Sequence, residues 1–72
     1  MTQELENLYR SAEKADAEFQ AAVIRQFGKR NAGDMRYRGS RHNAETKAAA
    51  ERYWVAINAF LDASEAARKH AA

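Results

Sequence analysis

Apolar residues recur along this chain at alternating spacings of three and four, in two long segments that a polar stretch separates. The stripe of the first segment consists of Leu5, Leu8, Ala12, Ala15, Phe19, Ala22 and Gln26, widened by Tyr9, Val23 and Phe27. The stripe of the second segment consists of Ala50, Tyr53, Trp54, Ile57, Phe60, Leu61 and Ser64. Such spacing places each stripe on one face of an α-helix. It predicts one helix over about residues 3–27 and a second over about residues 43–70.

Helix-breaking residues are confined to the stretch between the two stripes. All three glycines lie within residues 28–42, and the chain contains no proline. Gly28, directly after Phe27, is typical of the left-handed residue that closes a helix. Asn43 is a typical N-cap, and Glu45 in the following turn complements the helix dipole. We therefore expect the first helix to end at Phe27 and the second to begin at about Asn43, with a connector over residues 28–42.

Two helices of similar length that are joined at one end favour an antiparallel hairpin. We predict an all-α fold in which residues 1–72 form one helical-hairpin domain. A single continuous helix would have to include Gly33 and Gly39, which cost about 1 kcal/mol each in a helix interior. It would also lose both capping signals. A chain of 72 residues buries little apolar surface in this shape, since even a compact fold of that size buries only about 60% of the surface that it exposes when unfolded.

The hairpin needs a further partner to bury its apolar residues. One helix-on-helix seam gives a free energy close to zero once conformational entropy is counted, and there is no cysteine to form a disulfide. We predict that two hairpins form a symmetric homodimer, a four-helix bundle. The residues predicted for the core and the dimer interface are Leu5, Leu8, Phe19, Val23, Phe27, Tyr53, Trp54, Ile57, Phe60 and Leu61. Ile24 and Val55 lie off the stripes and mark an additional contact. The alternatives are a weakly ordered monomer with an exposed apolar edge, or a different protein that covers this edge.

Positive charge is concentrated in the connector. The whole chain has 12 basic and 10 acidic residues, a net charge of +2. Residues 28–42 contain five bases and one acid, whereas residues 1–27 contain three bases and five acids. The connector also has fifteen residues, where about two to eight usually join a pair of helices. A loop of this excess length is either functional or disordered.

The connector is the candidate site for nucleic acid or another anion. The residues predicted to bind it are Lys29, Arg30, Arg36, Tyr37, Arg38, Ser40 and Arg41. The bases would neutralise phosphates, Tyr37 would stack on a nucleobase, and Ser40 would bind a phosphate oxygen together with the first amides of the second helix. The alternation of arginine with Met35 and Tyr37 predicts a short extended segment that leaves Arg36 and Arg38 free on one side. The alternative is a solvated loop whose arginines pair with acids of the first helix or pack across a dimer interface.

Asp16 and His42 are candidates for specific roles. Asp16 lies within the apolar sector of the first helix, where it would pair with an arginine from the connector or a partner, or reach water at the stripe edge. His42 and Glu45 are three positions apart, a spacing that metals use, but a metal site would need further ligands. We expect His42 to cap the second helix or to face solvent. His70, in the last turn, would interact with the dipole at the helix C-terminus.

The sequence favours a non-enzymatic protein. It has no nucleophile beside a base, no paired carboxylates with a pocket and no glycine pattern of a nucleotide-binding loop, so we expect no catalytic, cofactor-binding or metal-binding residues. No apolar run approaches the roughly 18 residues that span a bilayer, and residues 1–4 lack the features of a signal peptide. We therefore expect a cytoplasmic location without membrane contact. The predicted function is that of a small helical interaction protein, which self-associates or binds another protein. The alternative is a nucleic-acid-binding or regulatory accessory protein that uses residues 28–42.

Overall fold

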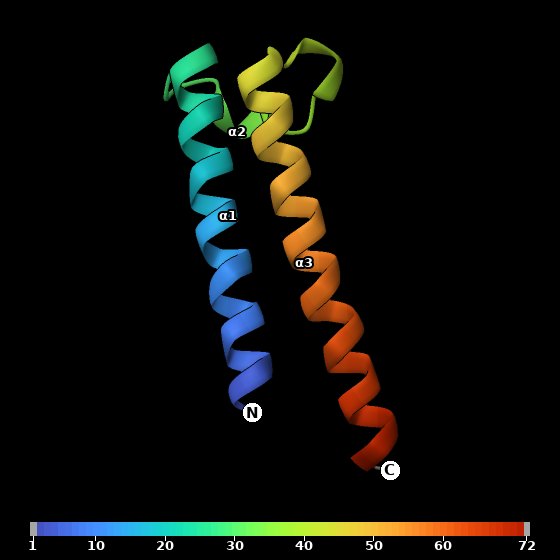
Figure 1. The fold of residues 1–72 in the computed structure, drawn as a ribbon. Coiled ribbons are helices and arrows are strands. Elements are labelled where there is room, and N and C mark those ends of the chain that lie inside the picture. Colours follow the sequence, from blue (N-terminus) through green and yellow to red (C-terminus); the bar gives the residue numbers. More distant parts are fainter. Residues whose placement is uncertain (1, 72) are drawn as a thin grey trace.

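A computed structural model describes residues 2–71 of the chain and shows an antiparallel helical hairpin. Helix α1 spans Gln3–Phe27 and helix α3 spans Ala44–Ala71, and the two lie side by side (Figure 1). The connector between them contains a short helix, α2, at Ala32–Met35 and a single 3-10 turn, η1, at Gly39–Arg41. No strand occurs within residues 2–71. The all-α hairpin predicted from the sequence is confirmed.

The ends of the long helices are closed by local hydrogen bonds. The hydroxyl oxygen of Thr2 accepts a bond from a backbone amide in the first turn of α1. At the other end of α1, Gly28 has a φ of +87°, which favours glycine, and its N–H donates to the Ile24 carbonyl at 2.8 Å. The side-chain oxygen of Asn43 accepts from the backbone N–H of Thr46 at 2.9 Å. The predicted caps at Gly28 and Asn43 are confirmed, whereas the sequence pattern did not indicate the cap at Thr2.

The buried core lies in the half of the hairpin next to the connector. Small side chains at the seam, such as Ala15 and Ala22, let the two long helices approach closely. The buried cluster consists of Phe19, Ala22, Val23, Ala32 and Ala49. Thr46 is also buried, and its hydroxyl donates to the Ala22 carbonyl at 3.5 Å. The core therefore joins α1 and α3 and receives one residue, Ala32, from α2.

The ten residues predicted for the core and the dimer interface differ in burial. Phe19 and Val23 are buried in the protomer. The half-buried members are Leu5, Leu8, Phe27, Tyr53, Ile57 and Phe60. Trp54 and Leu61 are 58% and 53% exposed, so they do not belong to the core of a single protomer. One seam between two helices cannot enclose so many large side chains, and the dimer interface stays a prediction.

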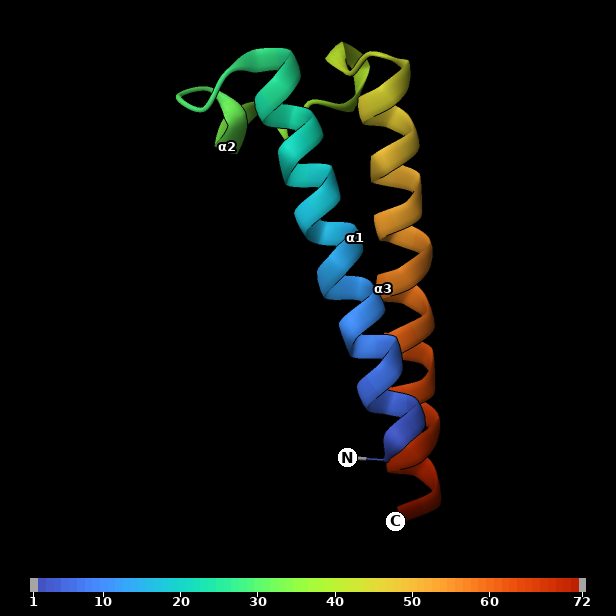
Figure 2. The ribbon, with the colours of Figure 1, turned by 60° about the vertical axis from the view of Figure 1, so that its left-hand side comes forward.

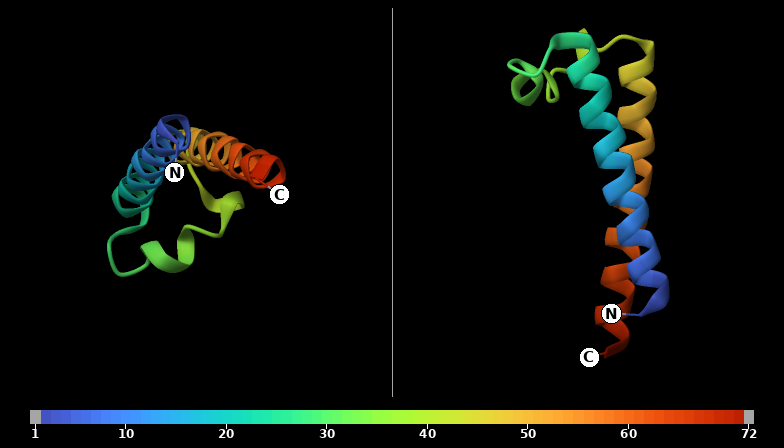
Figure 3. Two further views of the ribbon diagram at one scale, coloured as in Figure 1. Left: turned by 90° about the horizontal axis from the view of Figure 1, so that it is seen from below. Right: turned by 90° about the vertical axis from the view of Figure 1, so that its left-hand side faces the viewer.

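The connector folds back along one side of the hairpin instead of projecting from its end. Figure 2 shows α2 beside the last turns of α1, and Figure 3, seen from below, places it on the concave side between the two long helices. We call the side that faces α2 the front face and the opposite side the back face. The prediction of an extended segment around Met35 and Tyr37 is wrong. Residues Ala32–Met35 are helical, and Arg36 continues with helical dihedral angles, φ −55° and ψ −36°. An alternation over four residues is too short to distinguish a strand from one helical turn.

The hairpin is elongated, with principal extents of 44 × 19 × 19 Å. The front face is therefore a long surface, and the connector covers only one end of it. None of the helices in the described part of the chain has the length and apolar character needed to cross a bilayer.

Candidate functional site

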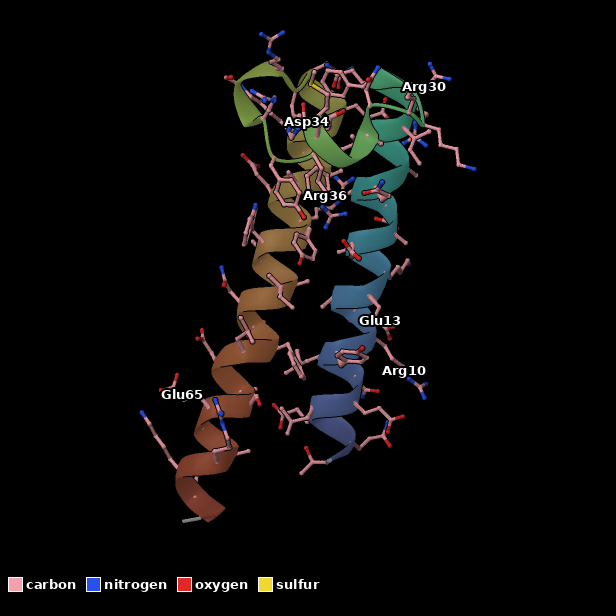
Figure 4. All side chains as sticks on the ribbon, turned by 180° about the vertical axis from the view of Figure 1, so that it is seen from behind. Arg10, Glu13, Arg30, Asp34, Arg36 and Glu65 are labelled. Carbon is pink, nitrogen blue, oxygen red and sulfur yellow. The ribbon has the colours of Figure 1, made fainter. Side chains whose placement is uncertain are left out.

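Arg36 anchors the connector to the front face. Its guanidinium donates to the carboxylate of Asp16 and, at 2.9 Å, to the side-chain oxygen of Gln20, both on α1. The same group lies over the rings of Phe19 and Tyr53, with Cζ 4.6 and 5.3 Å from the ring centroids. Only 15% of the Arg36 side chain is exposed (Figure 4). Of the alternatives for Asp16, the structure shows the pair with a connector arginine. Arg36 is therefore not free for phosphate, contrary to the prediction.

His42 is buried against α1, and its predicted exposure to solvent is wrong. The residue is 8% exposed and packs against the rings of Phe19 and Phe27, at centroid distances of 5.8 and 6.1 Å. Its Nε2 lies 2.8 Å from the carbonyl oxygen of Met35, the last residue of α2. Since a carbonyl only accepts, Nε2 carries the proton and donates. His42 thus connects α2 with the aromatic core, a role that its sequence neighbours do not indicate.

Gln26 holds the point where the connector enters α3. Its side-chain amide donates to the Arg41 carbonyl at 2.8 Å, and its side-chain oxygen accepts from the backbone N–H of Asn43, also at 2.8 Å. The sequence pattern placed Gln26 in the apolar stripe of the first helix and assigned it no role. A polar residue at a stripe position was the only signal for this contact.

The remaining connector residues that were predicted to bind an anion are on the surface. The exposed members are Lys29, Arg30, Tyr37, Arg38, Ser40 and Arg41. Arg38 pairs within the connector, with its Nε 3.0 Å from Asp34 Oδ2. Arg30 lies at the outer edge of the connector beyond α1, whereas Arg36 lies at the centre of the front face (Figure 4). The connector therefore presents a diffuse basic surface.

Net charge differs between the two ends of the hairpin. We define the loop half as residues 16–55 and the terminal half as residues 2–15 and 56–71. The loop half contains eight bases and five acids, a net charge of +3, and the terminal half contains four bases and five acids, a net charge of −1. The molecule is therefore polarised along its long axis.

The back face is polar and carries ion pairs between the two long helices. Arg25 Nε lies 2.9 Å from Glu45 Oε1, and Arg52 Nε lies 4.0 Å from Glu18 Oε2. Glu18 is two residues from Asp16, about 200° around α1, and so points away from the front face. All four side chains of these pairs are more than 45% exposed, so water screens the pairs and they add little stability.

The front face of the terminal half is apolar and lies outside the area that the connector covers. Tyr9 lies seven residues before Asp16, on the same side of α1, and its ring packs against Phe60 at a centroid distance of 5.4 Å. Leu61 lies seven residues after Trp54 on α3. Tyr9 and Leu61 are 44% and 53% exposed. We call this surface the uncovered strip, which consists of Tyr9, Ile57, Phe60 and Leu61.

A pocket of about 440 Å³ opens between the connector and α3. Its walls include Arg36, Tyr37, Lys47, Tyr53 and Trp54. Within residues 2–71 no three His, Cys, Asp or Glu side chains gather closely enough to hold a metal ion.

Comparison with protein-family models, curated proteins and solved structures found no match to this chain.

Proposed function

We propose that this protein is a non-enzymatic interaction protein of the cytoplasm whose hairpins associate in pairs through the uncovered strip. One observation supports this above all: in the terminal half, the large apolar side chains of Tyr9 and Leu61 stay exposed outside the area that the connector covers. Tyr9 lies on the same side of α1 as Asp16, which the connector contacts through Arg36 in the loop half. Large apolar side chains that stay exposed together can mark an interaction site.

A second hairpin would cover the front face of the terminal half, as the connector covers the front face of the loop half. In the loop half, α2 contributes Ala32 to the buried cluster and places the Arg36 guanidinium across two aromatic rings. Over the terminal half, no segment within residues 2–71 lies across the front face in this way (Figure 4). Two uncovered strips packed on each other would shield both sets of side chains and give four long helices around a shared core.

The position of the connector favours an antiparallel pair. The connector stands out from the front face at one end of the hairpin (Figure 3). In a parallel pair, two connectors would meet at the same end, and each has five bases and one acid. In an antiparallel pair, each connector would lie near the terminal half of the partner. The loop half of one hairpin, with a net charge of +3, would then face the terminal half of the other, with a net charge of −1, so repulsion is replaced by weak attraction.

Sedimentation or light scattering at micromolar concentration tests this association. We expect the wild type to have twice the protomer mass of 8.1 kDa. Leu61→Glu places a charge in the centre of the apolar contact and should give the protomer mass. The matched control is Val55→Glu, on the outer side of the same helix, where Val55 is 71% exposed. This control should remain a dimer.

A wild type that has the protomer mass at every concentration tested would contradict the proposal. Dissociation by both variants would show that charge on α3, and not the uncovered strip, controls association. The orientation can be tested separately because the chain has no cysteine. In an antiparallel pair, Leu61→Cys should form a disulfide with its own copy, whereas Trp54→Cys should not. Equal cross-linking of both variants would contradict the antiparallel arrangement.

A further inference from the structure

The pocket beside the connector has aromatic surface that the proposed dimer does not use. Its volume of about 440 Å³ lies within the range of about 300–1,000 Å³ that is typical of ligand sites. Tyr37 and Trp54 stand at its rim with 83% and 58% of their surface exposed. Tyr37 belongs to the connector and Trp54 to α3, so the two rings approach the pocket from different elements. Exposed rings in this setting offer faces on which a flat ligand can stack.

The wall behind these rings is held in place by packing. The ring of Trp54 lies 5.5 Å from that of Tyr53, which in turn stacks on Phe19 at 6.0 Å. The Arg36 guanidinium lies across both Phe19 and Tyr53, and Asp16 fixes that guanidinium through an ion pair. The pocket is therefore largely formed before a ligand enters, and binding would order few side chains.

Basic side chains outnumber acidic ones around the pocket. Asp16 neutralises Arg36, whereas Lys47, which also lines the pocket, forms no ion pair within the described residues. Glu51 is the acid among the lining residues, and it too forms no ion pair within the described residues, so the positive potential comes from the bases around the pocket. The surrounding loop half has a net charge of +3, to which exposed Arg41 in the connector contributes. A ligand with a flat ring and a negative group matches this combination better than an uncharged aromatic side chain does.

We propose that the pocket binds a nucleotide, either free or as a unit of single-stranded nucleic acid. The base stacks on Tyr37 and Trp54, and the ammonium of Lys47 binds the phosphate. Stacking tolerates any base because every base has a π-face, and the basic surface around the pocket follows a phosphate backbone. This site explains why Tyr37 is exposed beside an aromatic wall, and it does not require the association of two hairpins.

Trp54 is the only tryptophan of the chain, so its fluorescence reports directly on the pocket. The probes are an oligothymidylate of about 12 nucleotides, comparable with known single-strand site sizes of about 4–16, and thymidine 5′-monophosphate. We expect saturable quenching, and an affinity for the oligonucleotide that falls steeply as salt is raised. Tighter binding of the strand would identify nucleic acid as the source, and equal affinity on a per-nucleotide basis would identify a free nucleotide.

Two pairs of variants separate stacking from charge. Tyr37→Ala should weaken binding about tenfold, as expected for one stacked base, whereas Tyr37→Phe should bind like the wild type. Lys47→Ala should weaken binding and reduce its salt dependence, whereas Lys14→Ala, an exposed lysine on the terminal half of α1, should not. Absence of saturable quenching by both probes would overturn the site, as would unchanged binding by Tyr37→Ala. Because these readouts are fluorescence and affinity, and association is read as mass, either proposal can fail without the other.

Discussion

The loop half and the terminal half of this hairpin consist of the same two helices, yet only the loop half buries large apolar side chains, whereas the buried residues of the terminal half are the alanines Ala12 and Ala15. In the loop half, Phe19 is 4% exposed and Val23 is fully buried, and the connector lies across the front face. In the terminal half, Tyr9 and Leu61 remain about half exposed. The stripes on both helices continue through both halves, so the amphipathic pattern alone does not produce burial. A third layer over the front face makes the difference.

That third layer depends on a few polar contacts more than on apolar area. The connector contributes one buried apolar residue, Ala32, and its position is fixed by Arg36, His42 and the bonds that Gln26 makes to its end. Arg36 and Gln26 join the connector to α1, His42 packs on Phe19 and Phe27 of α1, and the bond from His42 to Met35 lies within the connector. The connector is therefore an integral part of the fold in the loop half. Substitutions that disturb its contacts should destabilise the loop half more than the terminal half.

Truncation of a core ring should give the largest contrast between the halves. Phe19→Ala removes a ring that contacts His42, Tyr53 and Arg36, and should lower the free energy of unfolding by about 3–5 kcal/mol. For a hairpin with a single seam, this loss should abolish cooperative unfolding. Phe60→Ala, in the terminal half, should lower the free energy of unfolding by only about 1–2 kcal/mol at low protein concentration, because this ring is only half-buried in the protomer. Urea denaturation followed by circular dichroism measures both, and equal losses would refute the contrast.

Loss of the Asp16 charge should have an intermediate effect confined to the loop half. Asp16→Asn leaves the Arg36 guanidinium, which is 15% exposed, without its counter-charge. Because Asp16 itself is 48% exposed, we expect a screened cost of about 1–2 kcal/mol. Trypsin should then cleave faster after the connector arginines. The control is Asp62→Asn, an exposed acid on α3, which should change neither the stability nor the cleavage rate.

Two glycines of the connector should respond oppositely to alanine, with the smallest effects of this series. Gly28 has a φ of +87°, so Gly28→Ala should destabilise the protein by about 1 kcal/mol. Gly33 lies inside α2, and a Cβ added there meets nothing within 4 Å. Gly33→Ala should therefore stabilise the protein by about 0.5–1 kcal/mol. Melting temperatures of the two variants measure this difference, and shifts of the same sign would contradict it.

The sequence predicted those features that depend on neighbouring residues alone. Periodicity over residues 5–27 and 50–64 predicted both long helices, and the caps at Gly28 and Asn43 follow from the chemistry of single side chains. Asp16 also stood out, because a charge within an apolar stripe needs a partner. The pattern left several partners open, and the structure shows Arg36.

The path of the connector could not be predicted, because it depends on contacts between residues far apart in the sequence. His42 is buried by Phe19 and Phe27 of α1, and nothing next to it in the chain signals those rings. The extended segment was expected from an alternation that one turn of helix produces equally well. The anion site was therefore predicted with Arg36 among its free bases, whereas that side chain holds the connector in place.

The antiparallel seam also implies an order in which its two halves come together. Arg25 and Glu45 meet across 20 positions of chain, while Tyr9 and Phe60 meet across 51. Closing the longer span first would cost about 0.8 kcal/mol more in chain entropy. Contacts between α1 and α3 should therefore form first beside the connector and then progressively towards the termini. On unfolding, the terminal ends of the two helices should be the first to separate.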